Sequence, residues 1–122
     1  YGYYYERTIS VQYPGLSGKE TMERIMTEVR EAGLDSIAGY DVIKTDDYLT
    51  GESSAADGQV ETLNYPPSNV LRYTFEDGGW IALRPSGTEP KIKLYMSTIG
   101  DSMAEAQSKV DSYEEAMRGK IE

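Results

Sequence analysis

Three alternating segments between Val70 and Met96 constrain the fold of this chain more than any other feature. Apolar side chains recur at every second position: Leu71, Tyr73 and Phe75, then Ile81 and Leu83, then Ile92, Leu94 and Met96. Because successive side chains of a strand point to opposite faces of a sheet, this spacing predicts three strands with one buried face. The turn residues Glu76-Asp77-Gly78-Gly79 separate the first two strands, so we expect an antiparallel meander.

Two amphipathic helices flank these strands in the sequence. Each begins with a capping-box pattern, Ser17 to Glu20 and Ser102 to Glu105, and a glycine, Gly33 or Gly119, is predicted to end it. The apolar residues between them follow helical spacing. They are Met22, Ile25, Met26 and Val29 in the first helix, and Met103, Ala106, Val110, Tyr113 and Met117 in the second.

These elements, with a further strand over residues 40–45, predict an α+β fold. We expect two layers, an antiparallel sheet of about four strands with two helices packed on one face. Residues 46–69 show little periodicity and are expected to form a long mobile or functional loop. Four of its five carboxylates could be considered as a calcium site, but they lack EF-hand spacing, so a solvated loop is favoured. The four are Asp46, Asp47, Glu52 and Asp57.

Composition excludes several functions. The 122 residues suit one domain, and they contain no cysteine and no histidine. Disulfides, thiolate nucleophiles, Cys/His zinc sites and histidine bases are therefore excluded. A net charge of −9 disfavours nucleic acid as a partner. The absence of cysteine, of a leader peptide and of a membrane-spanning run predicts a cytoplasmic protein with no membrane partner.

The start of the chain is rich in tyrosine. Tyr1, Tyr3, Tyr4 and Tyr5 lie within five positions, and residues 8–13 are expected to form a short strand or an extended linker. The rings suit either a surface that packs on a preceding domain or a cover for this domain's own core. We expect residues 1–14 to be an N-terminal connecting segment, a former interdomain linker or interface, and residues 15–122 to be the domain proper. The first residue is Tyr rather than Met, which suggests a piece of a longer chain.

The segment Arg84-Pro85-Ser86-Gly87-Thr88-Glu89-Pro90-Lys91 joins two of the predicted strands. Gly87 permits a tight turn whose backbone N–H groups converge on an anion. Ser86 and Thr88 supply hydroxyls, Arg84 a planar fork suited to phosphate, and Lys91 a positive charge. Glu89 is expected to be solvated and to pair with Lys91 or Lys93. An ordinary hairpin turn uses similar residues, but two flanking cations are not needed for turning, which favours a phosphate-binding loop.

A longer stretch carries a resemblance to a known family. The run Ala82-Leu83-Arg84-Pro85-Ser86-Gly87-Thr88-Glu89-Pro90-Lys91-Ile92-Lys93-Leu94-Tyr95 resembles the phosphate-binding loop of the α-D-phosphohexomutases. The preceding Asp77-Gly78-Gly79-Trp80-Ile81 is similar to the strand that leads into that loop. The resemblance implies the last of four domains of a phosphoglucomutase or phosphomannomutase, an isomerase of carbohydrate metabolism.

The resemblance also implies a function. Family enzymes move a phosphoryl group between the 1- and 6-positions of a hexose with a phosphorylated serine, Mg²⁺ and glucose 1,6-bisphosphate. Those parts belong to preceding domains, the partners of this one, so no catalytic residue, metal ligand or cofactor is predicted here. What carries over is a grip on the non-reacting phosphate of the hexose phosphate by Arg84, Ser86, Gly87 and Thr88. We add Lys91 to the predicted phosphate-binding residues because of its positive charge, and not because of the resemblance.

Alternative functions remain. The chain suits the C-terminal domain of a phosphoglucosamine mutase equally in fold. It also suits a non-enzymatic interaction module that uses Tyr3, Tyr4 and Tyr5 as a contact surface. A complete small enzyme is disfavoured because no general base or metal cluster is visible.

Overall fold

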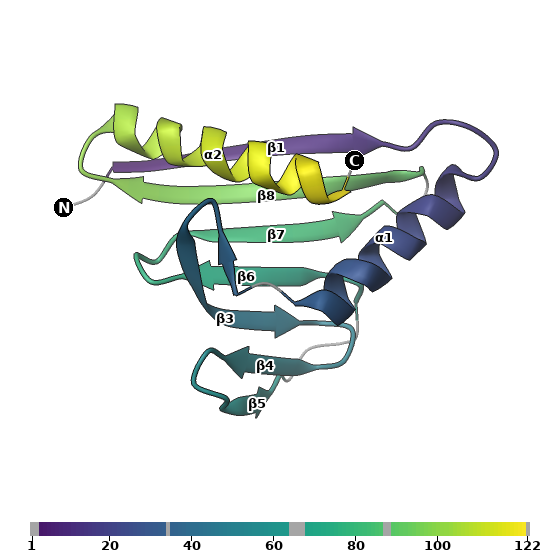
Figure 1. Ribbon diagram of the computed structural model, residues 1–122, viewed down its shortest axis with the longest axis horizontal. Coiled ribbons are helices and arrows are strands. Elements are labelled where there is room, and N and C mark those ends of the chain that lie inside the picture. Colours follow the sequence, from purple (N-terminus) through teal and green to yellow (C-terminus); the bar gives the residue numbers. More distant parts are fainter. Residues whose placement is uncertain (1–2, 34, 64–67, 87–88, 122) are drawn as a thin grey trace.

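The chain folds into an antiparallel sheet with two helices on one face (Figure 1). A computed structural model describes residues 3–33, 35–63, 68–86 and 89–121. The elements in chain order are β1 (Tyr3–Gln12), α1 (Gly18–Ala32), β2 (Ser36–Ile37), β3 (Tyr40–Asp47), β4 (Glu52–Ala55), β5 (Val60–Thr62), β6 (Leu71–Phe75), β7 (Trp80–Pro85), β8 (Lys91–Gly100) and α2 (Met103–Ile121).

The strand order confirms the α+β prediction and enlarges the sheet. The strands lie in the order β1-β8-β7-β6-β3-β4-β5, with β2 paired to β3, and all the pairs are antiparallel. The expected meander is β6-β7-β8. Leu71 lies opposite Leu83, and Leu83 lies opposite Leu94, so one buried row crosses three strands. The number of strands was underestimated, because the additional ones are either short or mostly polar.

β1 is the largest addition to the sheet. It pairs with β8 over ten residue positions, from Tyr3 opposite Gly100 to Gln12 opposite Lys91. The strand expected over residues 8–13 therefore begins five residues earlier. The side chain of Tyr5 packs against the core, whereas Tyr3 and Tyr4 are exposed. The division of the chain at residue 14 and the interface role of these tyrosines stay predictions.

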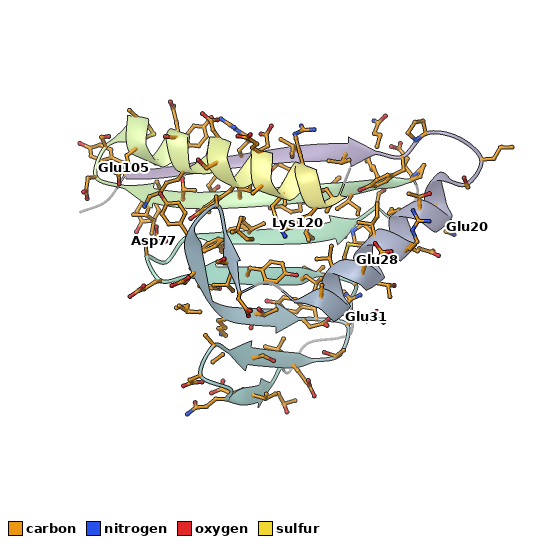
Figure 2. The ribbon with its side chains drawn as sticks, in the orientation of Figure 1. Glu20, Glu28, Glu31, Asp77, Glu105 and Lys120 are labelled. Atoms are coloured by element: carbon orange, nitrogen blue, oxygen red, sulfur yellow. The ribbon has the colours of Figure 1, made fainter. Side chains whose placement is uncertain are left out.

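The two helices pack on the same sheet face, as predicted (Figure 1). α1 buries the four expected residues of its apolar stripe, while Glu20, Glu28 and Glu31 lie on its outer side (Figure 2). α2 lies over β8 and β1. It runs past the expected stop at Gly119, because Ile121 continues the buried stripe one turn beyond Met117. Met103 was expected in that stripe but is exposed, since it is the first residue of the helix.

Residues 46–69 are not a structureless loop. They contain the end of β3 and the short hairpin β4–β5, which extends the edge of the sheet. The turn residue Gly58 has a φ of 94°, and the Gln59 N–H donates to Asp57 Oδ1. The sequence pattern missed these strands because their residues are mostly polar and do not alternate. They are held by backbone hydrogen bonds to the neighbouring strand rather than by a buried face.

Candidate phosphate-binding loop and the adjoining sheet face

The candidate loop is the β7–β8 connection. The register of these two strands determines where the positively charged side chains beside the loop lie. Ile81 and Leu83 are fully buried beneath the helices, and Arg84 is exposed on the opposite, helix-free face, as the alternation of β7 requires. Arg84 lies directly opposite Lys93 on β8. Among the described residues, neither side chain has an ion-pair or hydrogen-bond partner. Like charges directly opposite each other destabilise a sheet, so the fold gains nothing from this pair.

Backbone hydrogen bonds close the turn after Arg84. The Ser86 N–H donates to the Lys91 carbonyl at 2.8 Å, and the Lys91 N–H donates to the Glu89 carbonyl at 2.8 Å. The Glu89 N–H donates to Ser86 Oγ at 3.3 Å. These N–H groups are used within the turn, so an anion-binding nest would depend on the N–H groups of Gly87 and Thr88. Both residues lie outside the described part of the chain.

Lys91 differs from Arg84 in having a carboxylate partner. Its Nζ lies 3.2 Å from Glu89 Oε2, which confirms that Glu89 pairs with one of the two neighbouring lysines. The Lys91 side chain is 23% exposed and that of Glu89 is 60% exposed. Lys91 therefore offers an anion a weaker field than Arg84 or Lys93, whose charges have no such partner among the described residues.

The base of the loop is fixed to the start of α1. The Tyr13 N–H donates to the Pro90 carbonyl at 2.8 Å. Gly18, the first residue of α1, is buried against the same two residues. A Cβ there would lie 2.0 Å from the Tyr13 carbonyl oxygen and 3.1 Å from Pro90 Cβ, so only glycine fits without a shift of the chain. The positive end of the α1 dipole thus begins beside the loop.

The helix-free face next to the loop carries a hollow that the sequence analysis missed. It has a volume of about 370 Å³, and we call it the sheet hollow. Its lining residues are Tyr48, Ser68, Val70, Arg72, Trp80, Ala82, Arg84 and Tyr95. The Arg72 guanidinium carbon lies 4.6 Å from the centre of the Trp80 ring. Alternation along β6, β7 and β8 places the lining residues of these strands on the sheet face away from the core. That alternation is the sequence pattern from which their shared face could have been predicted.

A second charged cluster lies at the far end of β7 from the loop. Lys109 on α2 donates from Nζ to Asp77 Oδ2 at 2.9 Å and to the Ile99 carbonyl at 2.7 Å. Burial alone would raise the pKa of Asp77, but the hydrogen bonds from Lys109 and from the Gly79 N–H outweigh it and lower the pKa. Burial likewise opposes the positive charge of Lys109, and the bond to Asp77 raises its pKa overall. This cluster ties α2 to the β6–β7 turn and is structural.

The described residues do not gather donors for a metal. No group of three or more Asp or Glu side chains within this part of the chain could hold an ion such as Mg²⁺. No helix within the same residues is long and apolar enough to cross a membrane.

Comparison with known proteins identifies the family of this chain. A family model described as phosphoglucomutase/phosphomannomutase, C-terminal domain, matches residues 40–118, which is more than half of the chain. The chain belongs to the phosphoglucomutase/phosphomannomutase family. The matched span begins with β3 and ends within the last turns of α2, so it includes the whole meander and the candidate loop.

Curated relatives in this family are named phosphoglucomutase. The one from Staphylococcus saprophyticus is 46% identical over 97 residues, 79% of this chain and 17% of the relative. The one from Staphylococcus aureus strain MSSA476 is 50% identical over 84 residues, 68% of this chain and 15% of the relative. The one from Staphylococcus haemolyticus is 35% identical over 113 residues, 92% of this chain and 20% of the relative. The chain spans a fifth or less of the length of these relatives.

Proposed function

We propose that this chain is the phosphate-gripping C-terminal domain of a phosphoglucomutase or phosphomannomutase. In this role the β7–β8 loop binds the non-reacting phosphate of a hexose phosphate while the phosphoryl group moves between the 1- and 6-positions. One observation carries the proposal. Arg84 and Lys93 lie side by side without a carboxylate partner among the described residues, although the chain has a net charge of −9.

Each loop residue has a role in this proposal. Arg84 offers a planar guanidinium that contacts two phosphate oxygens at once. Ser86 and Thr88 contribute hydroxyls, and Gly87 allows the backbone to approach the anion closely. Lys91 contributes less, because Glu89 already neutralises part of its charge. Lys93, which the sequence analysis left out of the site, adds to the field at Arg84.

The loop would act by positioning and not by chemistry. Binding a remote, non-reacting group holds a substrate in the orientation that the reacting end requires. The phosphorylated serine, the Mg²⁺ ion and glucose 1,6-bisphosphate would be supplied with the preceding domains of the same cytoplasmic enzyme. We therefore expect the chain alone to be inactive as a mutase and to bind phosphate weakly, around millimolar, or about −4 kcal/mol.

Two other functions compete with this one. The relatives named above are phosphoglucomutases, which favours that activity over phosphoglucosamine mutase. A protein-interaction role draws support from Tyr3 and Tyr4, residues that are 53% and 66% exposed at the start of an edge strand. The same exposure is expected of a surface that contacts a preceding domain, so these tyrosines support partner domains more simply than a separate module.

An amide NMR titration with inorganic phosphate tests the loop. We expect saturable shifts at Arg84, Ser86 and Lys91 in the natural chain, and their loss in Arg84→Ala. Arg24→Ala is the matched control, since Arg24 is an exposed arginine on α1, whose guanidinium Nε lies 3.9 Å from Glu28. An Arg84→Ala variant that binds phosphate as well as the natural chain, or a natural chain with no shifts in the loop, would contradict the proposal.

A further inference from the structure

The sheet hollow has a small floor and tall walls. Ala82 lies at its centre on β7, with Trp80 and Arg84 two positions away on the same strand and face. Across the neighbouring strands, Ala82 lies opposite Arg72 on β6 and Tyr95 on β8. Four long side chains thus surround one methyl group. The helices cover the other face of the sheet, so the hollow opens away from them (Figure 1).

Arg72 is held in the hollow by a ring rather than by a carboxylate. Its guanidinium carbon lies 4.6 Å from the centre of the Trp80 ring, within the range of a cation–π interaction. Among the described residues its Nε has no hydrogen-bond partner, although that atom is buried. Asp46 lies opposite Arg72 on β3, but no ion pair joins the two side chains. The guanidinium is therefore placed against the ring, and its terminal N–H groups make no hydrogen bond to another described residue.

The lining suits a single sugar ring. Binding sites for small molecules are lined by apolar and aromatic groups with a few placed polar groups, and occupy about 300–1,000 Å³. At about 370 Å³ the sheet hollow is at the lower end, which fits one ring. The C–H face of a sugar ring would pack on Tyr95 and on the floor at Ala82. Its hydroxyl oxygens accept hydrogen bonds from a guanidinium, which has only donors.

We propose that the sheet hollow binds the sugar ring of the hexose phosphate whose phosphate is held at Arg84. This inference rests on the proposed function, because Arg84 both begins the loop and lines the hollow. Ala82 lies two residues before Arg84 on the same face, about 7 Å along the strand. One ligand can therefore reach both. In this arrangement Arg72 and Tyr95 contact the sugar, and the chain recognises more than a phosphate group.

The test compares two phosphate monoesters on the full chain. Methyl phosphate carries the phosphate alone, and glucose 1-phosphate carries the phosphate and the ring. We expect glucose 1-phosphate to bind about tenfold more tightly than methyl phosphate, a difference of about 1.4 kcal/mol. In amide NMR spectra it should shift Trp80, Ala82 and Tyr95, which methyl phosphate leaves unchanged.

Two variants separate the ring from the phosphate. Ala82→Leu fills the floor, and Arg72→Met removes the donors while keeping an extended side chain beside Trp80. Both should reduce the preference for glucose 1-phosphate to about onefold and leave the affinity for methyl phosphate within twofold. Ala104→Leu is the matched control, because Ala104 is exposed in the first turn of α2. Should Ala82→Leu fail to fold, Arg72→Met gives the same readout at an incompletely buried position.

The outcomes separate this inference from the proposed function. Equal affinity for the two esters, unchanged in both variants, overturns the sugar site and leaves the phosphate loop standing. Shifts of Trp80 and Tyr95 by glucose 1-phosphate, without any effect of methyl phosphate at Ser86, place a ring in the hollow but contradict the phosphate loop, and therefore overturn the shared ligand proposed here. No binding of either ester overturns both.

Discussion

The two faces of the sheet differ in how their arginines are held. On the helix-free face two lysines, Lys44 and Lys91, have carboxylate partners in Asp46 and Glu89, but no arginine of the described residues does. On the helix-covered face, arginines are paired with carboxylates. Arg7 Nη1 lies 2.7 Å from Asp111 and 3.2 Å from Glu114 on α2, and Arg30 Nε lies 2.9 Å from Asp47. On the helix-free face, Arg84 and Lys93 lie opposite each other with no such partner among the described residues. The bonds of Arg7 to Tyr5, to Asp111 and to Glu114 raise its pKa still further, so that cation is committed to the fold.

This difference indicates which charges serve stability and which serve binding. A cation that joins a strand to a helix reduces the freedom of both elements and neutralises an acidic side chain. A pair of like charges on neighbouring strands destabilises the sheet by roughly 0.2–1 kcal/mol. A chain with 21 acidic residues had carboxylates to spare for that face, yet the described residues place none against this pair. The arrangement is explained if an anion supplies the missing charge.

The largest test of the comparison replaces two consecutive residues of β7. Leu83→Ala should lower the free energy of unfolding by about 3 kcal/mol, because Leu83 is fully buried between the sheet and the helices. Arg84→Ala should change it by less than about 0.5 kcal/mol, or raise it slightly, because the like-charge contact with Lys93 is removed. Urea denaturation followed by circular dichroism measures both. A loss above 1.5 kcal/mol in Arg84→Ala would show that Arg84 serves the fold, and the contrast between the faces would fail.

The second test concerns the ion pair between Asp77 and Lys109. Because the pKa of Asp77 is lowered from 3.8 in the folded chain, this group stabilises the fold above that pH, and the contribution is lost as the pH falls through the folded-state pKa. We expect Asp77→Asn to be about 1 kcal/mol less stable than the natural chain at pH 7 and nearly equal to it near pH 2.

Urea denaturation at several pH values measures this difference. Asp57→Asn is the control, since Asp57 is exposed in the β4–β5 turn. The expected difference for Asp77→Asn shrinks as the pH is lowered. A difference that stays constant from pH 7 to pH 2 would mean that the carboxylate charge contributes nothing there, and that the pairing of charges is not what distinguishes the helix-covered side.

Periodicity predicted the parts of the fold that have a buried face. The meander, the two helices and the exposure of Arg84 follow from alternation and helical spacing, because burial forces apolar residues into those positions. The hairpin β4–β5 did not follow, since strands such as Glu52–Ala55 are held by backbone groups that leave no side-chain pattern. The order of the strands in the sheet could not be predicted from local patterns either. Nothing local in residues 3–12 indicates that they pair with β8, which lies some ninety residues later.

The candidate site was predicted as a loop, and the sheet hollow that we propose as a sugar site lies beside it. Arg84, Ser86 and Lys91 were identified from residue type, which reports chemistry but not partners. The bond between Lys91 and Glu89 and the stacking of Arg72 on Trp80 depend on side-chain geometry. Lys93 was missed as a site residue because only the strand register places it opposite Arg84.

The smallest expected effect on stability comes from Lys93→Glu, and it is the sharpest test of what the helix-free face is for. A glutamate at that position would lie opposite Arg84 and convert a repulsive pair into an attractive one. The free energy of unfolding should rise by a few tenths of a kcal/mol. Binding of inorganic phosphate should fall by tenfold or more, because the new carboxylate competes with phosphate for Arg84. Lys120→Glu is the control for the change of net charge, since Lys120 is an exposed residue of α2 with no ion pair to another described residue. Calorimetric unfolding and phosphate titration of the same samples give the free energy of unfolding and the phosphate affinity.

A variant that gains stability and loses phosphate binding is expected if the unpaired cations are kept for a ligand at the expense of stability. A variant that gains stability and binds phosphate as before would show that Arg84 is an ordinary surface residue at the end of a strand.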